Sequence, residues 1–320
     1  MSSDDEDEDR PHRSTLMLLT AAEHGHVDDL RLLLAAKADV DESDKNQTTL
    51  NCAAENGHGD AVECLLMANA PINVEDLYTG HVNVLRALVN AKADLDAEWM
   101  YETPLFHAAE QDNAEAVKLL VAAKSNINAG KDSEKGLTPL GVAVLENHRH
   151  TLAVLIDAKA DLDTRYDPGK TAAFLAIEDG RIAALEMLVA AKADIDSPCR
   201  DDRWTMTPCL SCAIDRSNEA VSVLVNGKAD VNPVVDDDSN RPLTLAVARE
   251  NVEAVRILLD AKANVNGDRN VVSRMLRAIR FNAPTEHRHR QAEMLRLLLD
   301  AKAQVNEADP YDDETPAYHA

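Results

Sequence analysis

Aromatic residues are scarce in this chain: they make up 3% of its 320 residues, although 45% of the residues are hydrophobic. The apolar share is mostly Ala, Leu and Val. Small aliphatic side chains with so few aromatics favour thin layers of closely packed helices over one deep globular core. The length alone would allow two or three ordinary domains.

Basic residues are also in short supply. The chain has 33 Lys and Arg against 57 Asp and Glu, which gives a formal net charge of −24. Such a surface repels phosphates and anionic lipid headgroups, so we expect neither nucleic acid nor a membrane surface as a partner. A basic protein surface would instead be attracted.

Long hydrophobic runs and a cysteine framework are missing as well. No run approaches the roughly 20 apolar residues that span a bilayer. The first nine residues, Met1 to Asp9, are acidic and polar, which does not fit a secretory signal. Five scattered cysteines, an odd number, do not predict a set of disulfides. We therefore expect a reduced compartment, the cytosol first and the nucleus second.

An internal repeat is the main feature that the sequence does contain. The segment Ala-Lys-Ala-Asp-Val-Asp begins at Ala36, and nine copies of it in variant form are present, this one included. Its second position is marked by Lys37, Asn69, Lys92, Lys124, Lys159, Lys192, Lys228, Lys262 and Lys302. The typical spacing is about 33 residues, a period that indicates a solenoid.

Each full copy has the same internal order of signals. Thr103-Pro104-Leu105 predicts a helix start, because the Thr hydroxyl can cap a helix and Pro is tolerated at the first helical position. Ala108-Ala109 allows neighbouring helices to approach closely. A second helix is predicted over residues 114–123 from apolar residues at i, i+3 and i+4. Helices this short are unstable alone, but stacked pairs bury a continuous core.

These patterns resemble the ankyrin-repeat family. The resemblance rests on Thr103-Pro104-Leu105-Phe106-His107-Ala108-Ala109, Gly25-His26-Val27-Asp28 and Ala229-Asp230-Val231-Asn232. It implies an all-α solenoid of stacked helix-turn-helix units with protruding turn fingers over residues 15–320. We expect about nine repeats plus a truncated tenth, preceded by an acidic disordered tail at residues 1–14.

The chain departs from the family pattern in several places. The family usually has Gly where this chain has Lys eight times and Asn once, so each Lys should cost up to about 1 kcal/mol if the left-handed backbone persists. A cation at a helix C-terminus stabilises the helix by about 0.3–1 kcal/mol, which offsets part of this cost. The third copy, near residues 74–96, is degenerate and lacks a first helix with Thr-Pro. We also expect an insertion near residues 281–291 and an incomplete repeat at residues 307–320.

Motifs that suggest chemistry have plainer interpretations. Cys209 and Cys212 form a Cys-x-x-Cys, but both align with core positions of a first helix and should pack as small hydrophobes. The basic run at residues 287–290 is read as a solvated loop. The acidic run at residues 236–240 lacks the Gly and Glu of a calcium loop. No catalytic constellation fits the repeat, so we expect no enzyme, no cofactor and no metal site.

Candidate partner-binding residues follow from the resemblance, because ankyrin repeats usually bind partners through the fingers and the exposed face of the first helices. Aromatic side chains in polar loops are good interface anchors. The acidic finger residues suggest a partner with both basic and apolar groups. The predicted set is Trp99, Tyr101, Tyr166, Trp204 and Tyr311 in fingers, Phe106 and Phe174 on first helices, and the acidic Asp236, Asp237 and Asp238.

The expected function is a scaffold or adaptor that binds a protein through its fingers and concave face. One alternative is the regulatory or targeting portion of a longer enzyme, ubiquitin-ligase component or channel. Another, motivated by the degenerate third copy, is a diverging product without a partner.

Overall fold

The computed structural model describes residues 13–41, 43–44, 47–130, 136–166, 169–200, 206–234, 240–266 and 285–304. The chain divides into two compact units, Met1–Ala160 and Asp161–Ala320. Each unit is described by itself below.

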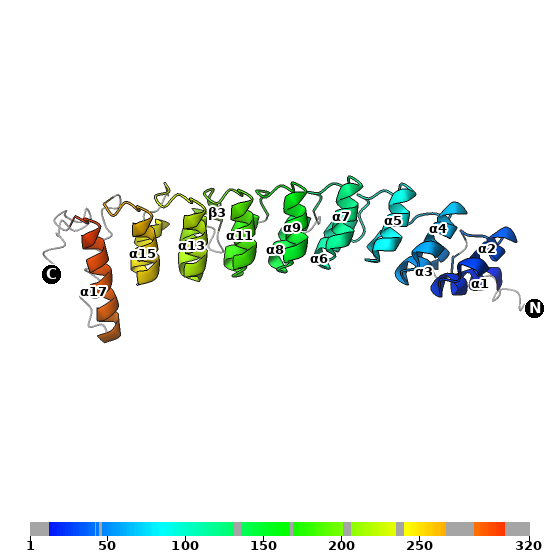
Figure 1. The fold of residues 1–320 in the computed structure, drawn as a ribbon, viewed down its shortest axis with the longest axis horizontal. Helices are drawn as coiled ribbons and strands as arrows, with labels where there is room; N and C mark the ends of the chain where they lie inside the picture. The colour runs from blue at the N-terminus through cyan, green and yellow to red at the C-terminus, as the bar shows by residue number, and fades with distance from the viewer. Residues whose placement is uncertain are drawn as a thin grey trace, which may run out of the picture. The chain divides into compact units, whose positions relative to one another are not determined.

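The first unit is a series of antiparallel helix pairs (Figure 1). The pairs are α1 (Arg13–Glu23) with α2 (Val27–Ala35), α3 (Thr49–Glu55) with α4 (Gly59–Met67), the 3₁₀ helix η1 (Val74–Tyr78) with α5 (Val82–Asn90), α6 (Pro104–Glu110) with α7 (Ala114–Ala122), and α8 (Pro139–Leu145) with α9 (Arg149–Asp157). The first members pack in the order α1, α3, η1, α6, α8, and the second members in the order α2, α4, α5, α7, α9. Two short antiparallel strands, β1 (Ser43–Asp44) and β2 (Gln47–Thr48), precede α3.

The second unit repeats this arrangement. Its elements are α10 (Ala172–Glu178) with α11 (Ile182–Ala190), the antiparallel strands β3 (Cys199–Arg200) and β4 (Met206–Thr207), α12 (Cys209–Arg216) with α13 (Asn218–Asn226), α14 (Pro242–Ala248) with α15 (Val252–Asp260), and α17 (Thr285–Asp300). Helices α10, α12 and α14 contact one another in sequence, as do α11, α13, α15 and α17. The predicted all-α repeat solenoid is therefore confirmed as a fold class.

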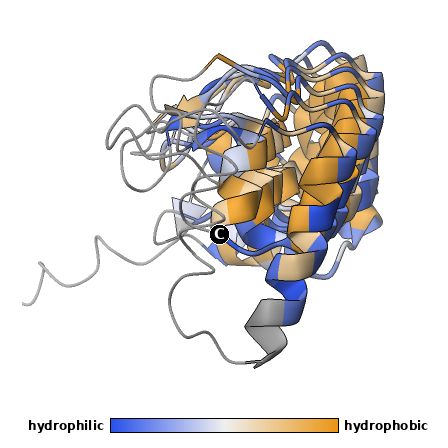
Figure 2. Ribbon diagram, turned by 90° about the vertical axis from the view of Figure 1, so that its left-hand side faces the viewer, coloured by the Kyte–Doolittle hydropathy of each residue, from blue (hydrophilic) through white to orange (hydrophobic). Residues whose placement is uncertain are grey.

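The core lies between the two rows of helices in each unit. In the pair α6–α7, Leu105, Ala109, Val117 and Leu120 are fully buried. In Figure 2 orange, hydrophobic stretches predominate on the helical ribbon and alternate there with blue, hydrophilic stretches. No helix in the described part of the chain is both long enough and apolar enough to cross a membrane.

The helix ends form as the sequence signals predict. Thr103 accepts a hydrogen bond from the Phe106 N–H at 3.2 Å, and Pro104 occupies the first turn of α6. At the other end of the pair, Lys124 has φ of 68°, and its N–H and that of Ser125 donate to the Val121 and Leu120 carbonyls. This is the Schellman arrangement of a helix C-terminus. All nine Lys and Asn residues at this repeat position have φ between 62° and 73°.

The degenerate third copy retains a first element, although it lacks the Thr-Pro start from which a first helix would be predicted. Residues Val74–Tyr78 form η1, capped by Asn73 and Asp76, whose side chains each accept a hydrogen bond from the other's backbone. Leu77 and Tyr78 are buried, so this short helix fills the place of a full first helix. The predicted second helix of this copy is present as α5.

Two predicted boundaries differ from the structure. Helix α1 begins at Arg13, inside the expected tail at residues 1–14. Helix α17 begins at Thr285, so residues 285–291 of the expected insertion, including the whole basic run at 287–290 that was expected to be a loop, are helical. The rest of the tail, residues 281–284 and the incomplete repeat at 307–320 lie outside the described residues.

Candidate protein-interaction surface

The fingers are held by a chain of side-chain acceptors that runs from repeat to repeat. In the first unit the Asn126 N–H donates to Asp96 Oδ1 at 2.7 Å. In the second unit the Asp194 N–H donates to Asp163 Oδ1 at 2.8 Å, and the Asp230 N–H donates to Asp196 Oδ1 at 2.7 Å. The recurring Asp and Asn of the repeat therefore fix where each finger starts.

Histidines at the inter-helix turns also join one repeat to the next. His58 contacts the Glu23 carbonyl at 3.0 Å through Nε2, and His81 contacts the Glu55 carbonyl at 3.1 Å in the same way. These two histidines therefore have a structural role between repeats. His26 belongs to the first described helix pair, and its Nδ1 lies 3.6 Å from Asp29 Oδ2.

The finger before α6 is a tight hairpin. The Trp99 and Glu102 backbones exchange two hydrogen bonds of 3.0 Å around Met100 and Tyr101. Met100 has φ of 51° and Tyr101 has φ of 68°, which are both left-handed and match a type I′ turn. Their side chains are 68% and 67% exposed. The tip thus presents a thioether and a phenol to solvent.

Tyr78 of η1 supports this hairpin from below. Its hydroxyl donates toward the Ala97 and Glu102 carbonyls and accepts from the Trp99 N–H at 3.2 Å. Its ring lies 5.4 Å from the rings of both Trp99 and His107. Burial raises the pKa of Tyr78 to about 12. Tyr78 could not be predicted as a supporting residue, because it belongs to the copy whose first helix has no recognisable sequence signal.

Of the predicted anchors, Tyr101 is exposed and Trp99 is half-buried. The other three predicted aromatic anchors that the structure describes are buried. Phe106 is 1% exposed, Phe174 is fully buried and Tyr166 is 2% exposed. The prediction that Phe106 and Phe174 lie on an exposed face is wrong, and Tyr166 lies in a finger as predicted but is buried there.

The error for the two Phe residues is a shift of one position along the helix, because the next residue reaches the open face instead. Phe106 and Phe174 each lie in the first turn of their helix and are buried, as is Leu210 at the same place in α12. The next residue along α6, His107, turns by about 100° and reaches the open face. Tyr166 fills the interior of its own finger, where its backbone pairs with Lys170.

The remaining predicted anchors lie outside the described residues. They are Trp204, Asp236, Asp237, Asp238 and Tyr311.

The cysteines behave as core residues. Cys209 is fully buried and Cys212 is 9% exposed, which confirms the apolar interpretation of the Cys-x-x-Cys. Burial raises the pKa of the Cys212 thiol to about 12. Cys199, in β3, is also fully buried. A hydrogen bond between the Cys199 and Cys209 thiols lowers the pKa of Cys199 and raises that of Cys209.

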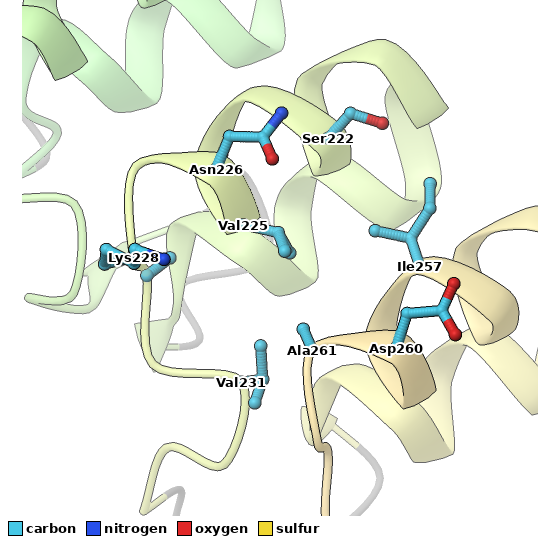
Figure 3. A pocket seen from close by; sticks show the side chains of 9 residues that line it. Ser222, Val225, Asn226, Lys228, Val231, Ile257, Asp260 and Ala261 are labelled. Carbon is cyan, nitrogen blue, oxygen red and sulfur yellow. The ribbon is translucent and has the colours of Figure 1, made fainter.

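Open grooves recur between consecutive second helices. One lies between α13 and α15, with Val225 and Asn226 on one side and Ile257 and Asp260 on the other (Figure 3). Similar grooves lie between α2 and α4 and between α5 and α7. Their linings mix small apolar groups with single charged groups, which fits gaps left by helix stacking rather than a pocket built for one ligand.

The open face of the first helices carries charged contacts between finger and helix. Lys170 Nζ lies 2.7 Å from Glu178 Oε2, with both side chains 11% exposed. In another repeat, Gln47 Nε2 donates to Glu55 Oε2 at 3.3 Å. A further cluster on this face consists of Glu102, His107 and Glu110, whose ligand atoms all lie within 4.8 Å of one another.

Comparison with known proteins agrees with this architecture. The family model described as ankyrin repeats (3 copies) matches residues 3–76, 126–199 and 196–269, and the model for a single ankyrin repeat matches residues 100–132. Similar curated proteins include the human transient receptor potential cation channel subfamily A member 1, with 25% identity over 51% of this chain. Rabankyrin-5 of Mus musculus is 22% identical over 52% of the chain, and the nuclear factor NF-kappa-B p105 subunit of Gallus gallus is 25% identical over 55%.

The matched stretch covers only 15% of the channel, 15% of Rabankyrin-5 and 17% of the p105 subunit. These similarities therefore concern the repeats and not the remainder of those proteins. Together the family matches cover well over half of the residues, and the helix pairs have the expected order. The chain belongs to the ankyrin-repeat family.

Proposed function

We propose that this chain is a non-catalytic scaffold or adaptor that binds a partner protein through its fingers and concave face. Ankyrin repeats are protein-interaction modules, which supports the general class of function. The observation that carries the proposal is the hairpin at Trp99–Glu102, with Met100 and Tyr101 exposed at its tip.

The backbone of this tip is unfavourable for the residues that occupy it. A left-handed conformation costs an L-residue with a Cβ about 1–2 kcal/mol, and type I′ turns strongly prefer Asn-Gly. Met100 and Tyr101 are two consecutive residues with this conformation. Because neither side chain is buried, the packing of the folded chain does not explain the choice of residues. Contact with a partner would explain it, since Tyr is frequent among residues that dominate binding energy.

The surroundings of the tip indicate the chemistry of the partner. Asp94, Asp96 and Glu98 precede the hairpin and are exposed. The formal charge of the whole chain is −24. An apolar tip flanked by carboxylates suits a protein surface that presents Lys or Arg beside apolar groups. The negative charge of the chain also disfavours binding to nucleic acid and to anionic membranes. A cytosolic or nuclear location would suit a partner protein with a basic surface.

A second candidate function is the targeting or regulatory portion of a longer protein. The matched relatives are much longer than the matched stretch, and one is named as a cation channel. This candidate also uses the repeats as a binding surface, so it differs only in what the surface is attached to.

The experiment compares three baits in affinity capture followed by mass spectrometry. They are the parent chain, the double variant Met100→Asn/Tyr101→Gly and the control Met67→Gln, which removes an exposed Met from the end of α4. Asn-Gly favours the observed turn, so the double variant should be at least as stable as the parent in thermal melts.

Proteins that the parent and the Met67 variant retain but the hairpin variant loses would support the proposal. Equal retention by all three baits would place the binding surface elsewhere. Loss by both variants would show that general stickiness of exposed methionines, and not the hairpin, is responsible.

A further inference from the structure

One contact recurs between finger and first helix in this fold. It joins the residue just before the capping Thr to the last residue of the first helix, and we call these two residues the finger–helix pair. In α3 the pair is Gln47 and Glu55, and in α10 it is Lys170 and Glu178. Both pairs are in direct contact, at 3.3 Å and 2.7 Å respectively.

The chemistry of these pairs is complementary. Gln47 donates a hydrogen bond to Glu55, and the Lys170 ammonium neutralises Glu178. In α8 the pair is Leu137 and Leu145, which are both apolar. In α3 and α10, the carboxylate at the helix end therefore faces a hydrogen-bond donor or a cation.

The pair at α6 breaks this rule, because it consists of Glu102 and Glu110. Their carboxylate oxygens lie within 4.8 Å of each other. The Glu102 side chain is 14% exposed, so water screens the repulsion between the two carboxylates only partly. Where α10 has an ammonium ion beside its carboxylate, α6 has a second carboxylate.

His107 adds a nitrogen ligand at the same place. It lies one turn before Glu110 on the same face of α6, and its Nδ1 is 3.9 Å from Glu102 Oε2. The ring of Tyr78, 5.4 Å away, packs against the imidazole and restricts its orientation. Tyr78 also holds the backbone carbonyl of Glu102 through its hydroxyl. Two of the three ligand-bearing residues are thus positioned by the same buried phenol.

We propose that Glu102, His107 and Glu110 bind a divalent transition-metal ion, Zn²⁺ in the first place. Imidazole and carboxylate ligands suit Zn²⁺, with bonds of about 2.0–2.2 Å. In a tetrahedral site, ligands at this distance lie about 3.4 Å apart, which small rotations of the two Glu side chains achieve from the observed separations. Three protein ligands leave one position for water, and the metal occupies the place that the Lys170 ammonium takes in the equivalent repeat.

The test measures Zn²⁺ binding to the full chain by calorimetry after dialysis against a chelator. Co²⁺ serves as a second probe, because its visible absorption reports nitrogen coordination and coordination number. Three variants address the site: Glu110→Gln, His107→Gln and Glu102→Lys. The matched control is Glu55→Gln, which changes the same helix position in a repeat where Cys52 replaces the histidine.

Each site variant should weaken one Zn²⁺ site at least about tenfold, since loss of an outer-shell partner alone costs 10–100-fold. Glu55→Gln should bind as the parent does. Glu102→Lys should also raise the thermal midpoint of the metal-free chain, because it recreates the Lys170–Glu178 ion pair. A higher thermal midpoint of Glu102→Lys would show that this variant loses Zn²⁺ binding because a ligand is missing and not because it misfolds.

The proposal is overturned if the parent binds no Zn²⁺, or if all site variants keep the parent's stoichiometry and affinity. Binding of Ca²⁺ or Mg²⁺ as tight as that of Zn²⁺ would also overturn it, since those ions prefer oxygen ligands and would not use His107.

Discussion

Replacing Lys124 tests the backbone geometry that recurs at every repeat. Lys124 follows α7 with φ of 68° and is exposed, so its side chain contributes no burial. We compare Lys124→Gly with Lys124→Ala, because both variants lose the same charge at the helix C-terminus. Only the backbone preference then differs between them.

The expected difference follows from the conformation. Ala in a left-handed conformation costs about 1–2 kcal/mol, whereas Gly adopts it freely. Gly loses more chain entropy on folding, by about 0.4–1 kcal/mol. The Gly variant should therefore be more stable than the Ala variant by about 0.5–1 kcal/mol. For a unit of this size, such a difference raises the thermal midpoint by about 1–4 °C.

Lys118, inside α7, provides the matched control. Its side chain is exposed and makes one ion pair with Glu115 at 2.6 Å, which both variants lose. There the order must reverse, because Gly in a helix interior is about 1 kcal/mol less favourable than Ala. Urea denaturation followed by circular dichroism at both positions measures the two differences. If Gly is not the more stable residue at Lys124, the reasoning from left-handed geometry fails.

Three further predictions concern buried or bridging groups. Phe106→Ala should destabilise the chain by about 3–5 kcal/mol, because the ring is buried, while Tyr101→Ala should change stability by no more than about 0.5 kcal/mol; chemical denaturation compares the two. Burial raises the pKa of Asp76 from 3.8 to about 6, so its contribution to stability is full below about pH 4 and is lost as pH rises through 6. The loss amounts to about 3 kcal/mol at 1.36 kcal/mol per pKa unit, and Asp76→Asn should remove it in melts recorded from pH 4 to 7. Asp196→Ala should cost about 0.5–1 kcal/mol, because the Asp230 N–H loses its acceptor, whereas Asp196→Asn keeps an acceptor and should be neutral in thermal melts.

Each of these predictions has a result that contradicts it. A Phe106→Ala variant as stable as the parent would mean that the ring is exposed, as the sequence alone suggested. Identical pH profiles for the parent and Asp76→Asn would show that this carboxyl is not desolvated. Equal destabilisation by Ala and Asn at position 196 would remove the side-chain acceptor from the explanation of how fingers are aligned.

Local signals in the sequence were enough to determine the repeat. The spacing of Lys37 and its equivalents indicated the period, and Thr103-Pro104 marked a helix start that the structure contains. The left-handed backbone at the Lys positions followed from the place of each Lys just after a helix. These features depend on neighbours within one or two turns, so a single sequence reveals them.

Tertiary packing decided which side chains are available at the surface. Phe106 and Tyr166 were predicted to contact a partner but are buried. Residues of adjacent repeats and of the folded finger cover them. Tyr78 could not be assigned a role until η1 was seen beneath the hairpin at Trp99. The meeting of Glu102 with Glu110 likewise depends on how the finger returns to the helix. Periodicity fixes the order of helices, but only the folded chain brings distant side chains within bonding distance.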